Sequence, residues 1–338
     1  MSVIVPIHNA REYLARTHEN LRRIAQDDVE FIVIDDHSDD GSGEMVKDWD
    51  DLANLLVLSS TTRGVAATRN QAVAAATGDF LWFADCDDDW DADVVSSMLR
   101  EADRAGADIV VSNAVKVMIP GDRSEIIQDA SVQEQITGSE ALQRLLVGSI
   151  QGHLWNKLFA RHLFESAPFP ATRAHSDLGG MFALLAAAKT VALLPEAHYT
   201  YYVHDGSILN QRAYRWLDLW DCLELAEAAV DAEGDGSDSV RQALIVFTYR
   251  NVIVPSINET IRREVSASPD DIRTFRARGR KRVKSRDLVW LASHGQADAA
   301  VRGGVIKWAF PAYRALYRRH RARTWAAVDQ QQAQSAQK

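Results

Sequence analysis

Residues 64–90 read GVAATRNQAVAAATGDFLWFADCDDDW and contain, in order, a helical pattern, an apolar run and a cluster of acids. The helical pattern places one charged residue, Arg69, on a stripe with Val65, Ala72, Val73 and Ala76. The run that begins at Phe80 is short and apolar throughout, which is typical of a strand buried on both faces. Acids from Asp85 to Asp89 follow it directly. A helix followed by a buried strand and a charged loop is a unit of an α/β sheet.

Four similar apolar runs begin at Val3, Phe31, Leu55 and Asp108. Helical patterns separate them. One of these patterns places six residues on a single face of the helix: Leu14, Thr17, His18, Leu21, Ile24 and Ala25. Alternation of strand and helix predicts a doubly wound α/β fold, in which a mostly parallel sheet carries helices on both faces and the crossovers are right-handed.

The order of elements changes after Ser112. We predict a hairpin over 114–127 with a Pro-Gly-Asp turn, helices over 138–147 and 177–187, strands over 191–194 and 198–203, and at least two helices over 212–263. We therefore expect a first domain at 1–210, a helical and basic region at 211–328, and a disordered tail at 329–338.

Composition indicates a folded protein without a disulfide framework. Of the 338 residues 46% are hydrophobic, and the two cysteines, Cys86 and Cys222, form no Cys-x-x-Cys pair. No apolar run approaches the ~18–20 residues of a membrane-spanning helix, and Met1 leads into SVIVPIHN without a signal-peptide pattern. We expect a cytoplasmic protein.

Charge is distributed unevenly along the chain. Residues 271–325 hold fifteen Lys and Arg against three Asp, whereas the whole chain has a net charge of -9. Within 305–325 there is no acid, and a helix opening at Pro311 would carry Tyr313 and Tyr317 on one face and arginines on the other. Such a helix suits the anionic inner face of the plasma membrane, and packing on the first domain is the alternative. The acidic front of the chain argues against nucleic acid as a partner.

Polar residues follow each of the first four predicted strands. In an open parallel sheet, ligands bind beyond the carboxyl ends of the strands. The residues at those ends are Pro6, His8 and Asn9, then Asp35 to Ser38, then Thr61 to Arg63, and finally Asp85 to Asp89. Four polar loops at one edge indicate a binding site rather than ordinary surface turns.

Three known motifs are candidates for the acidic cluster: a calcium-binding loop, a phosphatase nucleophile motif and a metal-binding Asp-x-Asp pair. An EF-hand loop from Asp85 would need Gly and Glu where Trp90 and Ser96 stand. A phosphatase-type nucleophile motif would need Thr or Val in place of Asp89. An Asp-x-Asp pair after a buried strand can instead hold a hard divalent cation that bridges nucleotide phosphates. Alternate residues of an extended segment point the same way, so Asp85 and Asp87 can share one ligand; whether the cation prefers Asp87 or Asp88 stays open.

With these motifs in order, the sequence resembles glycosyltransferases of family 2, which have the GT-A fold. SVIVPIHNAREYL (2–14), FIVIDDHSDDGS (31–42) and the stretch 64–90 follow the family's opening motifs. LWNKLFARHLF (154–164) and the segment from His175 to about residue 208 resemble its later ones. The resemblance covers residues 1–210 and is specific because five motifs occur in sequence. His8 stands where Tyr is usual, and Gly179-Gly180 replaces bulkier residues.

The resemblance implies roles for individual residues. The base and ribose of a nucleotide-sugar would lie against Pro6, His8, Asn9 and Asp36. Arg69 would lie near the diphosphate, and Asp85 would touch the ribose or the metal. Asp87 would be the main protein ligand of Mn²⁺ or Mg²⁺.

Asp177 matches the second acid of the family's Glu-Asp pair, which implies that it is the general base. A carboxylate within hydrogen-bond reach can take the proton of an acceptor hydroxyl as it attacks the sugar, and inversion follows. Capping of the helix that follows is the alternative role for this acid.

Four further residues are candidate acceptor or phosphate contacts, with structural roles as the alternatives: Trp155, Asn156, Lys157 and His204. The expected activity is metal-dependent transfer of a hexosyl or N-acetylhexosaminyl group, with inversion, from a nucleotide-diphosphate sugar such as a UDP-sugar. The expected acceptor is a hydroxyl of a cell-surface polysaccharide, teichoic acid or lipid-linked glycan. A nucleotidyl- or phospho-transferase and a degenerate binding scaffold are the alternatives.

Overall fold

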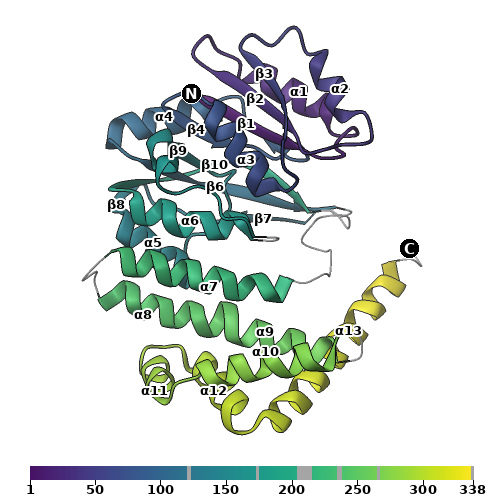
Figure 1. The fold of residues 1–338 in the computed structure, drawn as a ribbon, viewed down its shortest axis with the longest axis vertical. Coiled ribbons are helices and arrows are strands. Elements are labelled where there is room, and N and C mark those ends of the chain that lie inside the picture. The colour runs from purple at the N-terminus through teal and green to yellow at the C-terminus, as the bar shows by residue number, and fades with distance from the viewer. Residues whose placement is uncertain (120–122, 173–174, 204–214, 234–237, 265–266, 336–338) are drawn as a thin grey trace. The chain divides into compact units, whose positions relative to one another are not determined.

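The structure is a computed structural model that describes the chain except residues 120–122, 173–174, 204–214, 234–237, 265–266 and 336–338 (Figure 1). Contacts between residues divide it into two compact units, Met1–Arg241 (unit 1) and Gln242–Lys338 (unit 2). Within the described residues, none of the helices combines the length and apolar character needed to cross a bilayer.

Unit 1 contains a mixed, mostly parallel sheet (Figure 1). Its main path runs β3-β2-β1-β4-β9-β6-β10-β5, with β7 beside β6 and β8 beside β10. The strands are β1 (Ser2–Ile7), β2 (Glu30–Asp35), β3 (Leu55–Ser59), β4 (Phe80–Phe83), β5 (Asp89–Trp90), β6 (Ile109–Met118), β7 (Ser124–Ile127), β8 (Glu134–Thr137), β9 (Lys157–Ala160) and β10 (Thr190–Val203). The five apolar runs of the sequence form β1, β2, β3, β4 and the first part of β6. β3 differs from the prediction of a buried strand, because it is the edge strand of the main path and none of its residues is buried.

The register brings the carboxyl ends of the first strands together. β1 pairs with β2, and β2 with β3, in parallel, so that Ile7 lies opposite Asp35 and Asp35 opposite Ser59. β4 pairs with β1 on the other side, also in parallel. The loops after these four strands therefore share one edge of the sheet, as the parallel arrangement predicts.

The two strands predicted over 191–194 and 198–203 are one continuous strand, β10. Its register against β6 shifts between Leu194 and Ala197, around Pro195. Proline has no amide hydrogen to donate to the ladder and therefore interrupts the pairing without ending the strand. The two strands of the predicted hairpin are present, because β7 pairs with β6 in antiparallel fashion. Its predicted Pro-Gly-Asp turn, at residues 120–122, lies outside the described residues.

Helices cover both faces of the sheet. In β1, Val3 and Val5 belong to a buried cluster with Leu14, Val46 and Met98 of α1, α2 and α4, whereas Ile4 points to the opposite face, where α3 lies against β1. The helices of this unit are α1 (Leu14–Arg23), α2 (Ser42–Lys47), α3 (Val65–Ala75), α4 (Val94–Ala105), α5 (Gly138–Val147), a 3₁₀ turn at Arg161–Glu165, α6 (Ser176–Ala187) and α7 (Arg215–Ala232).

Unit 2 is helical. After α8 (Asp238–Phe247), which begins in unit 1, it contains a wider helical turn at Thr248–Ile253, then α9 (Val254–Arg262), α10 (Pro269–Arg282), α11 (Ser285–Ser293), α12 (Ala297–Trp308) and α13 (Phe310–Ser335). α10 packs on α9, α11 on α12, and α13 on both α9 and α12.

The aromatic face predicted for the basic helix packs partly against α9. Tyr313 is buried and donates to Asn258 Oδ1 on α9 at 2.8 Å. Tyr317 is partly exposed, and its hydroxyl accepts from Arg262 Nε at 2.7 Å. Among the side chains that the structure describes on α12 and α13, Val301, Trp308 and Leu316 are large apolar ones exposed at 64% each.

One buried carboxylate, that of Glu264, joins α10 and α13. It accepts from the guanidinium groups of Arg276, Arg314 and Arg318, with Arg314 Nη2 at 2.9 Å, and the Glu264 side chain is only 11% exposed. Burial opposes ionisation, but the hydrogen bonds from Arg276 and Arg314 lower the pKa of Glu264 below its ordinary value of 4.5. The carboxylate therefore stabilises the helix packing while it is ionised.

We expect Glu264→Gln to lower the free energy of unfolding of the full chain by about 1–3 kcal/mol at pH 7. A lowered native pKa means that this stabilisation is present above pH 4.5 and is lost as pH falls through the native pKa. The difference between wild type and variant, measured by urea unfolding, should therefore shrink below pH 4. Asp270→Asn, which removes a surface partner of Arg273 that is 85% exposed, is the control and should change stability by less than about 1 kcal/mol.

Candidate active site

A tight turn follows β1 and another follows β2, and hydrogen bonds connect the two turns. Asn9 and His37 adopt left-handed backbone conformations, with φ of 49° and 61°. His8 Nδ1 lies 2.7 Å from the Asp36 carbonyl oxygen, and the Asn9 amide donates to Ser38 Oγ at 2.9 Å. Pro6 is partly exposed near the end of β1. The structure thus brings Pro6, His8, Asn9 and Asp36 to one corner of the edge.

The Asp36 carboxylate is oriented by the start of α3. The Gly64 amide donates to both carboxylate oxygens, at 3.0 and 3.2 Å. Gly64 has φ of 113°, a conformation that side-chain-bearing residues rarely adopt. The side chain of Asp36 is 15% exposed. A carboxylate has about four acceptor positions, so this orientation leaves capacity for a ligand donor.

Arg69 of α3 joins two acids that are distant in the sequence. Its side chain is 5% exposed; Nη1 donates to Asp177 Oδ1, and Nη2 lies 3.5 Å from Asp85 Oδ1. The guanidinium also lies over the Phe169 ring, 5.9 Å from its centre. Burial disfavours its charge, but the charges of Asp177 and Asp85 raise the pKa of Arg69 further. The cation is therefore fixed between the two carboxylates.

The carboxyl of Asp85 is crowded by negative charge. Burial, and the charges of Asp87 and Asp177, raise its pKa to about 7 although Arg69 acts in the opposite direction. Its side chain keeps 35% exposure, so a ligand can reach it. Three mutually repelling carboxylates with one shared guanidinium form a local excess of negative charge.

Asp88 plays a different part from its neighbours. It is fully buried; its carboxylate accepts from the Tyr199 hydroxyl at 2.8 Å and from the Tyr202 amide at 2.9 Å. The same hydroxyl accepts from the Asp85 amide at 3.0 Å. Burial and the charges of Asp85 and Asp87 raise the pKa of Asp88. Because both Asp88 oxygens are bound to β10, we retain Asp87 rather than Asp88 as the candidate metal ligand.

The carboxylates at this strand end are suitable ligands for a divalent cation. Carboxylate oxygens are the ligands that Mg²⁺ and Mn²⁺ prefer. The charge of Asp87 contributes to the raised pKa of Asp85, and a cation between the two carboxylates would offset that repulsion. Asp85 and Asp87 are the residues that would hold it.

Asp177 lies in the first turn of α6. Ser176 Oγ donates to it at 3.2 Å, and the side chain is 35% exposed. Gly179 and Gly180 follow it where the family pattern has bulkier residues, and close packing explains this difference. A Cβ at Gly179 would come within 2.9 Å of Pro170, and one at Gly180 within 2.7 Å of Phe169. The glycines let α6 approach this segment closely.

Three sequence-predicted contacts lie in the interior. Trp155 stacks on Tyr199 with 4.7 Å between ring centres. Asn156 donates to the Ser112 carbonyl at 2.6 Å, and Lys157 Nζ lies 3.3 Å from Asp129 Oδ2, each fully buried. The structure therefore gives Trp155, Asn156 and Lys157 partners inside unit 1 and does not bring them to the strand edge. His204 lies outside the described residues.

Sequence reasoning missed the residues that hold the site together. Asn70 follows Arg69 and exchanges two hydrogen bonds, each of 2.9 Å, with the backbone of Phe169. Tyr199 links Asp85 to Asp88. The adjacency of Asn70 to Arg69 was the available signal for the first, whereas no pattern in the sequence links Tyr199 to the acidic loop.

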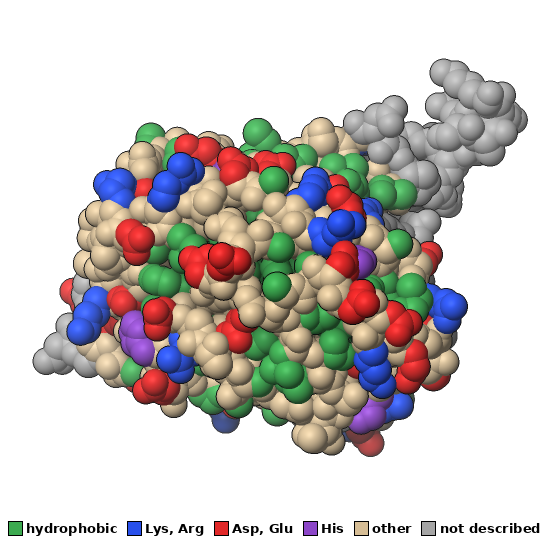
Figure 2. Space-filling model, turned by 90° about the horizontal axis from the view of Figure 1, so that it is seen from above, with side chains coloured by type: hydrophobic (Ala, Val, Ile, Leu, Met, Phe, Trp, Pro, Cys, Tyr) green, Lys and Arg blue, Asp and Glu red, His purple; other side chains and the backbone are tan. Residues whose placement is uncertain are grey.

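Surface charge is mixed on the face that Figure 2 shows. Acidic side chains lie between Lys and Arg side chains, and the described residues of this face form no continuous basic patch.

If Asp88 anchors the loop and Asp87 contacts a ligand, replacing each by alanine should affect the free energy of unfolding differently. Asp88→Ala should lower the free energy of unfolding by about 2–4 kcal/mol, because it leaves the buried Tyr199 hydroxyl and Tyr202 amide without their acceptor. Asp87→Ala should change it by less than about 1 kcal/mol. Chemical denaturation of both variants checks this; equal losses would contradict the division of roles.

Comparisons with known proteins agree with this geometry. Residues 2–165 match the family model described as glycosyl transferase family 2. The chain is 25% identical over 265 residues to the putative glycosyltransferase EpsH of Bacillus subtilis (strain 168), a match that covers 77% of each chain. It is 24% identical over 215 residues to the putative teichuronic acid biosynthesis glycosyltransferase TuaG of the same organism, covering 63% of this chain and 82% of that one.

The fold is similar to the crystal structure of S. aureus TarS 1-349 in complex with UDP-GlcNAc, with a TM-score of 0.71 and 18% sequence identity. This match covers 92% of the chain and 91% of TarS 1-349; at such low identity it concerns the fold alone. The ordered motifs and the family match together show that residues 2–165 form a domain of glycosyl transferase family 2.

Proposed function

We propose that unit 1 transfers a sugar from a nucleotide-diphosphate sugar to an acceptor hydroxyl, with inversion at the anomeric carbon. The observation that carries this proposal is the Arg69 bridge. One buried guanidinium contacts both Asp85, at the end of β4, and Asp177, at the start of α6. It therefore sets the distance between a donor-side acid and an acceptor-side acid.

On the donor side, the corner of Pro6, His8, Asn9 and Asp36 would receive the base and ribose. Asp36 has its carboxylate fixed by Gly64, so it can accept from a base N–H without losing side-chain freedom on binding. A divalent cation at Asp87 and Asp85, Mn²⁺ or Mg²⁺, would supply positive charge to the departing diphosphate.

On the acceptor side, Asp177 would act as general base. A sugar hydroxyl is a weak nucleophile, and Asp177 would take its proton during attack on the face opposite the diphosphate. Arg69 donates a hydrogen bond to the Asp177 carboxylate and holds it in one orientation. A general base lowers the barrier only while it is deprotonated.

The likeness to TarS bound to UDP-GlcNAc supports a uridine diphosphate sugar, with an N-acetylhexosamine among the sugars to test first. The similarity to TuaG, whose name refers to teichuronic acid biosynthesis, supports a cell-surface polysaccharide or related polymer as acceptor. A place at the inner face of the plasma membrane would give access to lipid-linked acceptors.

Asp177→Asn should reduce turnover by about 10²–10⁴-fold, the range typical of general-base removal. Donor binding should be retained, and the measurement is the shift of the unfolding midpoint with a panel of nucleotide-sugars and Mn²⁺. Glu196→Gln, an exposed acid on β10, is the control and should keep full turnover. Unchanged turnover in Asp177→Asn would exclude Asp177 as the general base. If the wild-type protein itself bound the donor but showed no turnover, a scaffold function would be favoured.

The membrane proposal depends on the surface that α12 and α13 expose. Leu316→Glu should weaken sedimentation of the full chain with anionic liposomes, because it places a negative charge beside Arg319 on the exposed side of α13. Val289→Glu on α11, at a residue that is 71% exposed, is the matched control and should sediment like wild type. Equal sedimentation of all three proteins would exclude this surface.

A further inference from the structure

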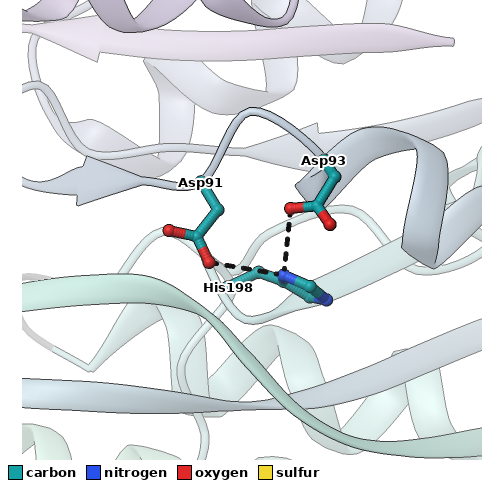
Figure 3. A group of neighbouring side chains, drawn as sticks. All are labelled: Asp91, Asp93 and His198. Atoms are coloured by element: carbon teal, nitrogen blue, oxygen red, sulfur yellow. Dashed lines mark ion pairs between the residues drawn. The ribbon is translucent and has the colours of Figure 1, made fainter.

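A cluster of two acids and one histidine lies where the acidic loop meets β10 (Figure 3). β5 pairs with β10 so that Trp90 lies opposite Tyr199, and the Asp91 amide donates to the His198 carbonyl at 2.9 Å. Asp93 follows two residues later, at the start of α4. The backbone thus places Asp91 and Asp93 against His198, 105 or more residues further along the chain.

The three side chains converge on one point. His198 Nδ1 lies 3.5 Å from Asp91 Oδ2 and 3.5 Å from Asp93 Oδ1, and Figure 3 shows both carboxylates turned toward this nitrogen. The three candidate ligand atoms all lie within 4.8 Å of one another. His198 is 9% exposed, and neither of its ring nitrogens has a hydrogen-bond partner.

These separations do not suit hydrogen bonds. An N–H···O bond has its donor and acceptor about 2.7–3.2 Å apart, and a lone pair on Nδ1 would be repelled by both carboxylates. Two ligands of one tetrahedral zinc ion, each about 2.0–2.2 Å from the metal, lie about 3.3–3.6 Å apart. The two distances of 3.5 Å fall within the range expected for ligands around a shared cation.

The acids are available for this role. Asp93 stands at the N-cap position of α4, but its side chain makes no capping hydrogen bond. Both carboxylates are 63% exposed, so an ion can enter from solvent and keep a water in a fourth position. One imidazole and two carboxylates form a donor set that suits Zn²⁺ better than Mg²⁺, which prefers oxygen ligands alone.

We propose that Asp91, Asp93 and His198 form a second divalent-cation site, selective for Zn²⁺, which pins the acidic loop to β10. Its ligands are different from the carboxylates proposed to hold the catalytic cation, and it does not depend on the transferase activity. On the earlier part of the loop, Asp88 is already held by Tyr199 and Tyr202 of the same strand. The ion would fix the later part, so that β10 holds the loop on either side of β5.

The test uses the full chain, stripped of metal with a chelator and then titrated with ZnCl₂ in equilibrium dialysis, with bound zinc measured by mass spectrometry. Wild type should bind one zinc at this site, and zinc should raise its unfolding midpoint in a saturable way. Asp93→Asn and His198→Gln should each lose affinity about tenfold or more and lose the zinc-dependent shift. MgCl₂ at the same concentrations should not reproduce the shift that depends on His198.

Two variants locate the ion. Asp103→Asn changes another exposed acid, on α4 itself, and should bind zinc like wild type. Asp87→Asn removes the candidate catalytic ligand and should also retain zinc at the proposed site. Because Asp93 is exposed, Asp93→Asn should match wild type in its metal-free unfolding midpoint within a few degrees, so its loss of zinc can be separated from misfolding.

Three results would overturn the proposal. One is the absence of saturable zinc binding by the wild type, and another is unchanged binding by His198→Gln and Asp93→Asn. The third is loss of zinc in Asp87→Asn with retention in Asp93→Asn, which would assign the ion to the strand edge. A failure of turnover in any of these proteins bears on the proposed transferase reaction and leaves the zinc measurement interpretable.

Discussion

The buried guanidinium of Arg69 is the constraint on which the candidate site depends. A cation removed from water is stable only if carboxylates compensate it, and loss of either partner would leave part of its charge uncompensated. Its partners, Asp85 and Asp177, come from a strand end and from a helix that lies 92 residues later in the sequence. The folding of unit 1 therefore requires that these two acids meet, whatever ligand later binds between them.

Close backbone approach makes this meeting feasible. Asn70 binds the backbone of Phe169, whose ring in turn lies beside Arg69 and against Gly180. A larger residue at Gly179 or Gly180 would push α6 outward, because the atoms in its way belong to Pro170 and to the Phe169 ring. The glycines that depart from the family pattern are thus explained by packing, and they allow Asp177 to reach the guanidinium.

Much of the sheet could be predicted because β1, β2, β4 and the first residues of β6 contain short apolar runs with helical patterns between them. β9 could not, because its first residue is Lys157, which reads as a surface residue. That lysine is fully buried and its ammonium lies near Asp129, a partner that no local pattern indicates. β9 also runs antiparallel between β4 and β6, an insertion that the alternation of strand and helix does not predict.

The acidic loop shows most clearly where sequence reasoning ends. Its acids look alike along the chain, and the Asp-x-Asp spacing predicts a ligand site at the strand end without distinguishing them. Their surroundings in the fold differ because each faces a different partner: Arg69 for Asp85, Tyr199 for Asp88, and His198 for Asp91 and Asp93. His198 and Tyr199 are adjacent on β10, at a register shift of this strand against β6. Two neighbouring residues of one strand therefore serve a buried anchor and a pair of exposed acids, and the chemistry open to each acid follows from the residue of β10 that it meets.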